Sequence, residues 1–467
     1  MKALPKNILS IGLSEGLSRL LGFFTTIYLA RVLDVKGFGI INIGLTVFAY
    51  ALLFGSQWLN LYGTRRIATG EDSGFVKSFF SLRLILSFFI VAIIVLFSVF
   101  FIKNQQLAIL VSMFALSVLP NALNLDWYFQ GKENLFPISF TRVLVSFGYL
   151  IVLLISFSFS ARYLFVPIAF FVGNTLGVLY IWFYFFKKAG GVSFRLSIAE
   201  SFSILKKAFG LSFASVLTQV NVNVPILAIS ILLTATDVGV FSAASKLVFF
   251  LLIADRLFYS IYFPAVTRIF SRTPDQLSEL VSFVIRISLV IVLPLALTCV
   301  FLANDLINLI YGTKYLLAAN VLKILVWYFC VTILNSILGY ALVAISKEKI
   351  YSRVVVCSTP IFLLMIAMFT YYAGVNGAAS AVVIYELLVL SIFKYHLKKS
   401  IDIHMFGHLL KIIPALAVLS ALLIILQPVN ILLSLIVALT LYTIAAYVMK
   451  AVSKSDLKML REKLLWN

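Results

Sequence analysis

The sequence predicts an all-α membrane protein that crosses a bilayer about fourteen times. Three observations lead to this fold class. Hydrophobic residues make up 63% of the 467-residue chain and charged residues only 12%, whereas a soluble domain is about half apolar and a quarter charged. Apolar runs of the length that a bilayer requires follow one another from end to end. Basic residues gather in every second connection between these runs.

The apolar runs form two sets, separated by a polar linker. The first set comprises residues 8–31, 38–61, 78–102, 107–129, 136–158 and 162–186. The second set comprises 205–233, 237–263, 279–303, 318–345, 350–372, 376–396, 406–427 and 429–450. We therefore expect an N-lobe of six helices at 1–190, a cytoplasmic amphipathic linker at 191–207, a C-lobe of six helices at 208–400, and two additional helices with a basic tail at 401–467.

The distribution of basic residues predicts the orientation of the chain. A formal net charge of +20 would suit a nucleic-acid partner, but the basic residues are scattered through short loops. With the N-terminus inside, the outer connections hold only Arg31, Lys36, Lys103, Arg162 and Lys314, and the inner ones hold most of the rest. Because cytoplasmic loops carry the excess of Lys and Arg, both termini are expected in the cytoplasm. Nucleic acid is not expected as a partner.

The polar linker carries apolar residues at helical spacing, namely Phe194, Ile198, Phe202 and Leu205. This pattern predicts a helix that lies in the membrane plane, with a plain solvated linker as the alternative. The tail at 455–467 repeats the pattern, with leucines on one face and basic residues opposite. That arrangement favours attachment to an anionic leaflet.

Two short sequences resemble each other across the halves of the chain. Asp34-Val-Lys-Gly-Phe-Gly39 opens the second span, and Thr236-Asp237-Val-Gly239 opens the eighth. In each, a small or polar residue follows the last glycine by three positions. Related halves with a binding site between them are a known plan of transporters, although one short match also arises by coincidence.

Ionisable side chains inside apolar spans are costly, so they mark either a cavity or a structural pair. Glu15 and Arg19 are one helical turn apart in the first span and can pair at i, i+4. Arg19 lies about 16 Å along its helix, near the bilayer midplane. Either the pair lines a cavity, where Arg19 meets an anion or Glu15 carries a proton, or it neutralises itself as a structural pair.

Two further charged residues lie deep in later spans. Lys246 has no carboxylate nearby on its own helix face, so it needs water, a partner or a ligand anion. Glu386 is a candidate for that partner, for a protonatable coupling site, or for a hydrogen bond between packed helices. Arg142 and Asp255 lie nearer the cytoplasmic ends, where we expect their side chains to reach the headgroups.

Polar stripes run along two more spans. The second span carries Asn42, Thr46, Tyr50 and Gln57, and the seventh carries Ser212, Ser215, Gln219 and Asn223. Such residues either hold helices together or line a wet cavity. In a cavity, hydroxyls, amides and an aromatic ring would suit the recognition of sugars.

Motifs for catalysis are absent from the sequence. It contains no phosphate loop of the form G-x-x-x-x-G-K-[ST], so ATP hydrolysis is not expected. The three histidines form no metal-binding pattern, and the three cysteines have no paired spacing. We therefore expect no enzymatic activity, no cofactor and no bound metal.

Several soft motifs, in their order along the chain, are shared with a known family. They are Ser14-Glu-Gly-Leu-Ser-Arg19-Leu-Leu-Gly22, Ala30-Arg-Val-Leu-Asp34, Arg65-Arg-Ile-Ala68, Trp127-Tyr-Phe-Gln-Gly-Lys-Glu133, Val238-Gly-Val-Phe-Ser-Ala-Ala-Ser-Lys246 and Gly374-Val-Asn-Gly377. In these motifs the chain resembles, over essentially its full length, the Wzx-type oligosaccharide flippases. These form the polysaccharide-biosynthesis branch of the multidrug/oligosaccharidyl-lipid/polysaccharide exporter superfamily.

The resemblance implies a MATE-like fold of two lobes around a central cavity, lined chiefly by the first, second, seventh and eighth spans. It implies that undecaprenyl-diphosphate-linked oligosaccharide moves from the cytoplasmic to the outer leaflet by alternating access, for O-antigen, capsule or exopolysaccharide assembly. The membrane would be the bacterial or archaeal cell (inner) membrane. An ion gradient or the membrane potential would drive the movement, and a polysaccharide polymerase and a chain-length regulator would be partners beside the membrane lipids.

The expected substrate site comprises Arg19, Lys246, Glu15, Asn42, Tyr50, Gln57, Gln219 and Asn223, and the coupling candidates are Glu15 and Glu386. Three alternatives stay open. One is an ion-coupled exporter of drugs or organic cations, for which the two glutamates would serve as cation partners. The others are a lipid II flippase and a non-transporting scaffold of a glycan assembly complex.

Overall fold

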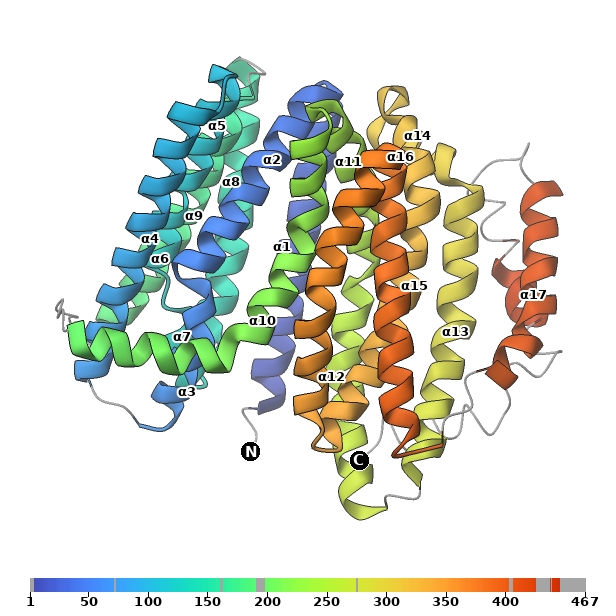
Figure 1. Ribbon diagram of the computed structural model, residues 1–467. Coiled ribbons are helices and arrows are strands. Elements are labelled where there is room, and N and C mark those ends of the chain that lie inside the picture. The colour runs from blue at the N-terminus through green and yellow to red at the C-terminus, as the bar shows by residue number, and fades with distance from the viewer. Residues whose placement is uncertain are drawn as a thin grey trace. The chain divides into compact units, whose positions relative to one another are not determined.

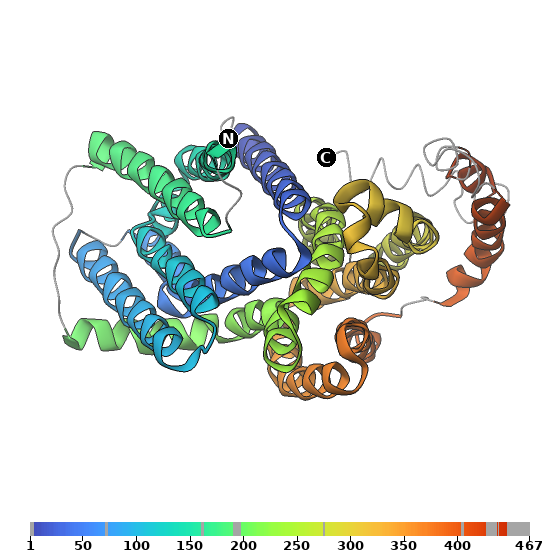
Figure 2. The same ribbon diagram turned by 90° about the horizontal axis from the view of Figure 1, so that it is seen from above.

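The computed structural model describes residues 4–70, 73–159, 163–189, 198–273, 276–402, 406–425, 437 and 439–445, and the regular elements in these ranges are helices. By their contacts the residues form two compact units, Met1–Gly239 and Val240–Asn467 (Figures 1 and 2). Nine helical segments within the described ranges are long and apolar enough to cross a membrane. The expected all-α polytopic fold class is therefore confirmed. The tail at 455–467 and most of the span expected at 429–450 lie outside the described residues.

Unit 1 contains ten α-helices and one short 3-10 helix up to the end of α10. They are α1 (Leu4–Val32), α2 (Val35–Gly55), η1 (Gln57–Leu59), α3 (Asn60–Ala68), α4 (Ser73–Phe101), α5 (Gln105–Leu116), α6 (Val118–Ala122), α7 (Asp126–Gly131), α8 (Phe136–Phe159), α9 (Phe165–Ala189) and α10 (Ile198–Leu232). The second span is shorter than expected, because α2 ends at Gly55. Gln57 therefore lies in the turn beyond the span rather than on its polar stripe.

The span expected at 107–129 is a broken helix, divided into α5, α6 and α7. A break at membrane depth frees backbone carbonyls that must find new partners. Nη1 of Arg83 donates a hydrogen bond to the carbonyl oxygen of Asn124 (2.7 Å), and Nε1 of Trp182 donates to that of Leu123 (2.9 Å). The Arg83 side chain also lies over the ring of Trp127, 6.0 Å from its centre, and Arg83 is only 2% exposed. This buried arginine, which the sequence did not single out, stabilises the break.

Replacing Arg83 with methionine tests this account of the broken span. Arg83→Met keeps an apolar side chain of similar length but leaves the Asn124 carbonyl without its donor, which costs about 1–3 kcal/mol of unfolding free energy. We expect a lower melting temperature for the purified variant in detergent. Lys103→Met, at an exposed position, is the matched control and should stay within about 0.5 kcal/mol of the wild type. Equal melting temperatures for Arg83→Met and the wild type would contradict the account.

The first part of α10, from Ile198 onward, covers the described part of the expected linker. Figure 1 shows it running crosswise near the lower ends of the helices of unit 1 before α10 turns upward. Its buried face is Ile204 and Ala208, which join the apolar cluster around Trp127. Phe202, expected on the same face as Leu205, is instead 70% exposed. The expected position Phe194 lies outside the described residues.

Helix α10 belongs to unit 1 and not to the C-lobe in which the sequence placed most of it. The sequence placed residues from 208 onward with the C-lobe, but α10 packs against α2, α3 and α4 and groups with unit 1. The hydroxyl of Tyr50 on α2 donates to the carbonyl oxygen of Val220 on α10 (2.9 Å), which adds a polar link to this packing. Tertiary contacts of this kind cannot be read from a linker's composition.

The two similar glycine sequences meet within unit 1, where the start of α2 crosses the start of α11 (Ala235–Leu251). A Cβ atom added to Gly39 would lie 1.7 Å from the carbonyl oxygen of Ala235, and one added to Gly239 would lie 2.2 Å from that of Val35. Each helix thus presents a glycine to the other's first residue. The sequence similarity has a physical reason, since the backbones approach too closely for any side chain.

Substitution of the crossing glycine tests the close approach. Gly39→Ala should lower the melting temperature, because the new methyl group can be placed only by moving the backbone of α11. Gly22→Ala is the matched control, since a Cβ there meets nothing within 4 Å, and it should be neutral or slightly stabilising. If both variants melt at the wild-type temperature in detergent, the crossing is looser than described.

Unit 2 contains most of α11 and the helices that follow. They are α12 (Ile253–Arg272), α13 (Leu277–Phe301), α14 (Ala303–Tyr311), η3 (Thr313–Tyr315), α15 (Leu317–Ala344), α16 (Glu348–Lys398) and α17 (Phe406–Ile425). Helix α16 contains both spans expected at 350–372 and 376–396, joined at Gly374, whose φ of +59° favours glycine. The span expected at 237–263 is interrupted between α11 and α12. Helix α17 lies at the edge of the unit beside α13 (Figures 1 and 2).

Candidate functional site

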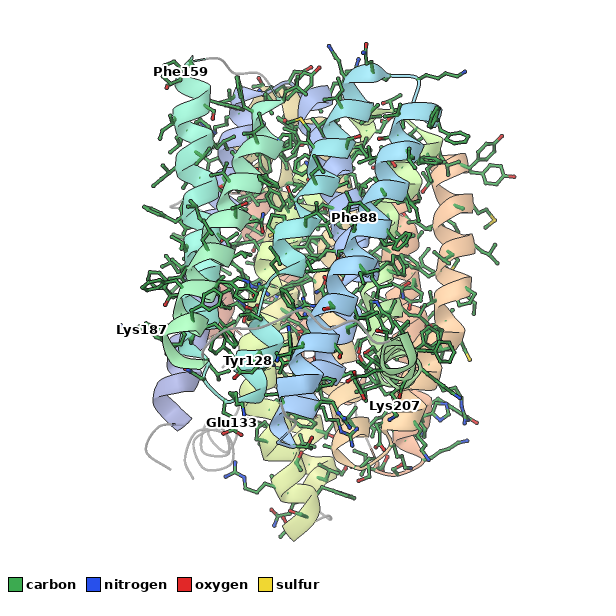
Figure 3. All side chains as sticks on the ribbon, turned by 90° about the vertical axis from the view of Figure 1, so that its left-hand side faces the viewer. Phe88, Tyr128, Glu133, Phe159, Lys187 and Lys207 are labelled. Atoms are coloured by element: carbon green, nitrogen blue, oxygen red, sulfur yellow. The ribbon has the colours of Figure 1, made fainter. Side chains whose placement is uncertain are left out.

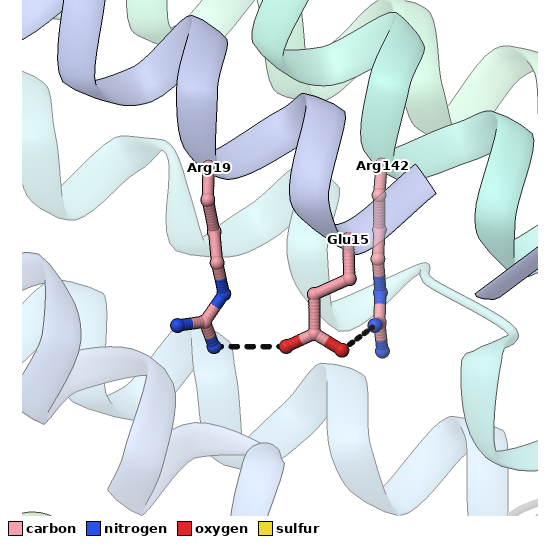
Figure 4. Close-up of polar contacts among 3 residues, drawn as sticks. All are labelled: Glu15, Arg19 and Arg142. Carbon is pink, nitrogen blue, oxygen red and sulfur yellow. Dashed lines mark hydrogen bonds and ion pairs between the residues drawn. The ribbon is translucent and has the colours of Figure 1, made fainter. Parts of the chain in front are cut away.

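Glu15 holds two arginines from different helices in unit 1. Oε1 of Glu15 accepts a hydrogen bond from Nη2 of Arg19 at 2.8 Å, and Oε2 lies 3.9 Å from Nη1 of Arg142 on α8 (Figure 4). The pairing of Glu15 with Arg19 follows from their i, i+4 spacing on α1. The approach of Arg142 does not, because it depends on how α1 and α8 pack.

Helices α1 and α8 run side by side in the same direction. Arg142 lies beside Glu15 at one end, and the rings of Tyr28 and Phe157 are 6.0 Å apart further along both helices. These two contacts align α1 and α8 along their length. Arg142, about 9 Å from the start of α8, is therefore level with the Glu15 carboxylate. Arg142 was expected to reach the headgroups. In the structure its guanidinium lies 3.9 Å from the carboxylate of Glu15 and the side chain stays 45% exposed.

The group of Glu15, Arg19 and Arg142 is accessible and carries an excess of positive charge. The side chains of Glu15 and Arg19 are 29% and 28% exposed, and that of Arg142 is 45% exposed. With both guanidiniums and the Glu15 carboxylate ionised, these three residues sum to a charge of +1. The buried Asp126 interacts with Arg142 and also with Arg83, so that counting Asp126 and Arg83 together leaves this sum unchanged. A half-exposed cationic group inside apolar helices suits an anion that approaches from the open side.

Some residues of the two polar stripes make hydrogen bonds within the helix packing, and others have exposed side chains. The amide of Asn42 donates to the carbonyl oxygen of Phe38 and is 2% exposed, and Tyr50 is used in the link to α10. These two residues act in helix structure and packing. Gln57 and Gln219 are exposed, and Asn223 donates a long bond of 3.4 Å to the carbonyl oxygen of Gln219. Among the expected site residues of the two stripes, Gln57 in η1 and Gln219 and Asn223 on α10 keep accessible amide groups.

A separate polar group lies within unit 2, where α15 contacts two carboxylates through consecutive residues. The amide of Asn335 donates to both the carboxylate and the backbone carbonyl of Glu386 on α16. Oγ of Ser336 donates to Oδ2 of Asp255 on α12 at 3.1 Å. Asn335 and Ser336 were not recognised in the sequence, because a single amide and hydroxyl in an apolar span have no distinctive spacing. Asp255 was expected to reach the headgroups.

Lys246 on α11 is half-buried, beside the buried residues Ser242 and Ser245. Within the part of the chain that the structure describes, its ammonium group has no hydrogen-bond or ion-pair partner. Glu386, one of the partners considered for it, bonds to Asn335 instead. Lys246 therefore keeps its donors available, and Glu386 acts as a hydrogen-bonded contact between packed helices.

A multi-pass helical fold with accessible charged groups inside its spans is typical of membrane transport proteins. Within this class, the chain belongs to the family described as "Polysaccharide biosynthesis protein", whose family model matches residues 4–270. A relative from the archaeon Haloferax volcanii, named "Probable low-salt glycan biosynthesis flippase Agl15", is 24% identical over 154 residues. That match covers 33% of this chain and 33% of the relative. The family expected from the soft motifs is thus confirmed.

Solved structures show the same fold. The lipid II flippase MurJ in an inward closed conformation is similar with a TM-score of 0.76 at 16% identity, over 94% of this chain and 98% of that chain. A multidrug resistance transporter of the MATE family in an inward-facing conformation gives a TM-score of 0.64 at 15% identity, over 82% and 94% of the two chains. At such low identity the matches concern the fold alone, and they confirm that it is MATE-like.

The geometry of the Glu15 group predicts unequal coupling of its two ion pairs. A double-mutant cycle of Glu15→Gln with Arg19→Gln should give a coupling energy of about 1–3 kcal/mol, because that pair is hydrogen-bonded at 2.8 Å. The same cycle with Arg142→Gln should give less than about 1 kcal/mol, because the atoms are 3.9 Å apart and Arg142 is nearly half exposed. The measurement is thermal unfolding of the purified variants, and equal couplings would contradict the described arrangement.

Proposed function

We propose that this protein moves a polyprenyl-diphosphate-linked oligosaccharide, of the undecaprenyl type, from the cytoplasmic to the outer leaflet of its membrane. The observation that carries the proposal is the accessible cationic group of Glu15, Arg19 and Arg142 inside the helices of unit 1. The family and the flippase among its relatives support a role in the handling of glycans rather than catalysis.

The diphosphate is the part of such a substrate that the group suits best. Guanidinium groups bind phosphate oxygens through two parallel hydrogen bonds, and this geometry favours Arg over Lys. Glu15 occupies donors of Arg19 that a diphosphate would compete for. The carboxylate therefore positions the guanidiniums while it limits the affinity for the anion, so that bound substrate can leave.

The remaining expected residues fit the other parts of such a substrate. The accessible amides of Gln57, Gln219 and Asn223 suit sugar hydroxyls. Lys246 is a second available cation, in unit 2. For coupling to an ion gradient we favour Glu386 over Glu15, because the carboxylate of Glu386 bonds to a neutral amide whereas that of Glu15 is held by two cations.

The test is translocation of a fluorescent polyprenyl-diphosphate sugar in vesicles containing the purified full-length protein. Arg19→Ala and Lys246→Ala should each slow translocation roughly tenfold to a hundredfold, since each removes a charged hydrogen-bond donor to phosphate. Arg31→Ala, at the exposed last turn of the same helix α1, is the matched control and should translocate at the wild-type rate.

The outcomes separate the proposal from its alternatives. Wild-type vesicles that move no lipid-linked sugar would identify a scaffold. Vesicles that accumulate organic cations but leave the lipid-linked sugar in place would identify a cation exporter. Normal rates in both alanine variants, with active wild-type protein, would remove Arg19 and Lys246 from the substrate site.

A further inference from the structure

Arg142 interacts with two carboxylates, and the proposed function uses only one of them. The first is Glu15 of α1, whose Oε2 is 3.9 Å from Nη1 of Arg142. The second is Asp126, the first residue of α7, whose carboxylate interacts electrostatically with Arg142 and with Arg83. Asp126 was not among the expected site residues, because its local sequence does not indicate that α7 lies beside α8.

Helix α7 and the start of α8 form a hairpin. The backbone N–H groups of Glu133 and Asn134 donate to carbonyl oxygens in the last turn of α7 and close the turn between the helices. Beyond this turn α8 contacts α7. Figure 3 shows Glu133 near one end of unit 1 and Phe159, the last residue of α8, at the opposite end.

The hairpin brings Asp126 and Arg142 to the same level. Tyr128 on α7 lies above Glu133 in Figure 3, so α7 and α8 both extend from the turn toward the same end of unit 1. Asp126 is about 8 Å from the last residue of α7, and Arg142 is about 9 Å from the first residue of α8. The two residues are therefore at the same height on adjacent helices, which agrees with the interaction between their charges.

Asp126 is fixed within the broken span, whereas Arg142 is accessible. The N–H of Asp126 donates to Oδ1 of Asn124 at 3.0 Å, and the carbonyl oxygen of Asn124 accepts the hydrogen bond from Arg83. Oδ1 of Asp126 is buried and accepts no hydrogen bond from the described residues. Arg83 is 2% exposed and Arg142 is 45% exposed. Of the two arginines that interact with Asp126, Arg142 is thus the one that can also meet a ligand.

The charge of Asp126 opposes the binding of an anion by Arg142. A fixed carboxylate attracts the guanidinium toward α7 and lowers the positive potential that a phosphate would meet there. The distance of 3.9 Å to Glu15 is longer than a hydrogen bond, so Arg142 is not committed to Glu15 either. The position of Arg142 therefore depends on carboxylates from two different helices.

We propose that Asp126 is a positioning residue of the substrate site, which restrains Arg142 through its charge and so weakens the hold of this arginine on the diphosphate. The inference rests on the proposed function, because it concerns the same diphosphate and the same arginine. Asp126 acts through Arg142 and does not contact the ligand. Together with Glu15 it keeps the affinity low enough for bound substrate to leave.

The experiment measures the binding of a fluorescent polyprenyl-diphosphate sugar to the purified full-length protein in detergent, by fluorescence anisotropy. Asp126→Asn should lower Kd about fivefold, because it removes the charge and keeps the size of the side chain. Asp126→Ala removes the same charge with a different shape and should agree with it within about twofold. Glu133→Gln is the matched control, since Glu133 is exposed at the turn of the same hairpin, and its Kd should stay within about twofold of the wild type.

The dependence on Arg142 separates positioning from a direct effect of the charge. In an Arg142→Gln background, Asp126→Asn should change Kd by less than about twofold, because the residue through which Asp126 acts is missing. If the full change of about fivefold persists in that background, Asp126 acts on the ligand directly and the positioning role is wrong. A loss of binding sites and a lower melting temperature at wild-type Kd would give Asp126 a structural role alone and would also overturn the proposal.

Translocation by the wild-type protein in vesicles separates this inference from the proposed function. If the wild type moves the lipid-linked sugar and both Asp126 variants keep the wild-type Kd, the inference fails and the proposed function stands. If the wild type neither binds nor moves the lipid-linked sugar, both fail. Tighter binding in both Asp126 variants that requires Arg142 is the result that supports the inference.

Discussion

A charge inside an apolar span needs a partner, and in this protein the partner repeatedly comes from another helix. Glu15 of α1 meets Arg142 of α8, Arg83 of α4 meets the carbonyl oxygen of Asn124, and Glu386 of α16 meets Asn335 of α15. Because an unpaired polar group in hydrocarbon is unfavourable, these groups form specific contacts between helices. The apolar surfaces of these helices are chemically alike, so polar contacts of this kind distinguish one register from another.

Accessibility decides which of these polar contacts can also act on a ligand. Arg83 is 2% exposed and its donor is used at a broken span, so its role is structural. Arg142 is 45% exposed and only 3.9 Å from a carboxylate, without a close hydrogen bond to it. The residue type is the same, but burial and the quality of the existing contact differ. A ligand anion can compete for the second arginine at little cost and cannot reach the first.

The sequence predicted the fold class, the family and the position of most spans, because hydrophobic runs are local and have the length of the bilayer. It did not predict where spans break, since Arg83 and Trp182 supply the necessary donors from distant parts of the chain. The pair of Glu15 and Arg19 was predicted from its i, i+4 spacing, and the structure shows that contact. Arg142 and Asn335 could not be assigned, because their roles depend on the packing of α8 on α1 and of α15 on α16.

The carboxylate of Glu15 bears on how tightly its group could hold an anion. It accepts a hydrogen bond from Arg19 at 2.8 Å and lies 3.9 Å from Arg142. Under the proposed function, an anion has to compete with this carboxylate for the guanidinium donors. Such a competitor lowers the affinity for the anion and speeds its release, which a transported substrate requires, whereas two arginines without a carboxylate between them would hold the anion longer.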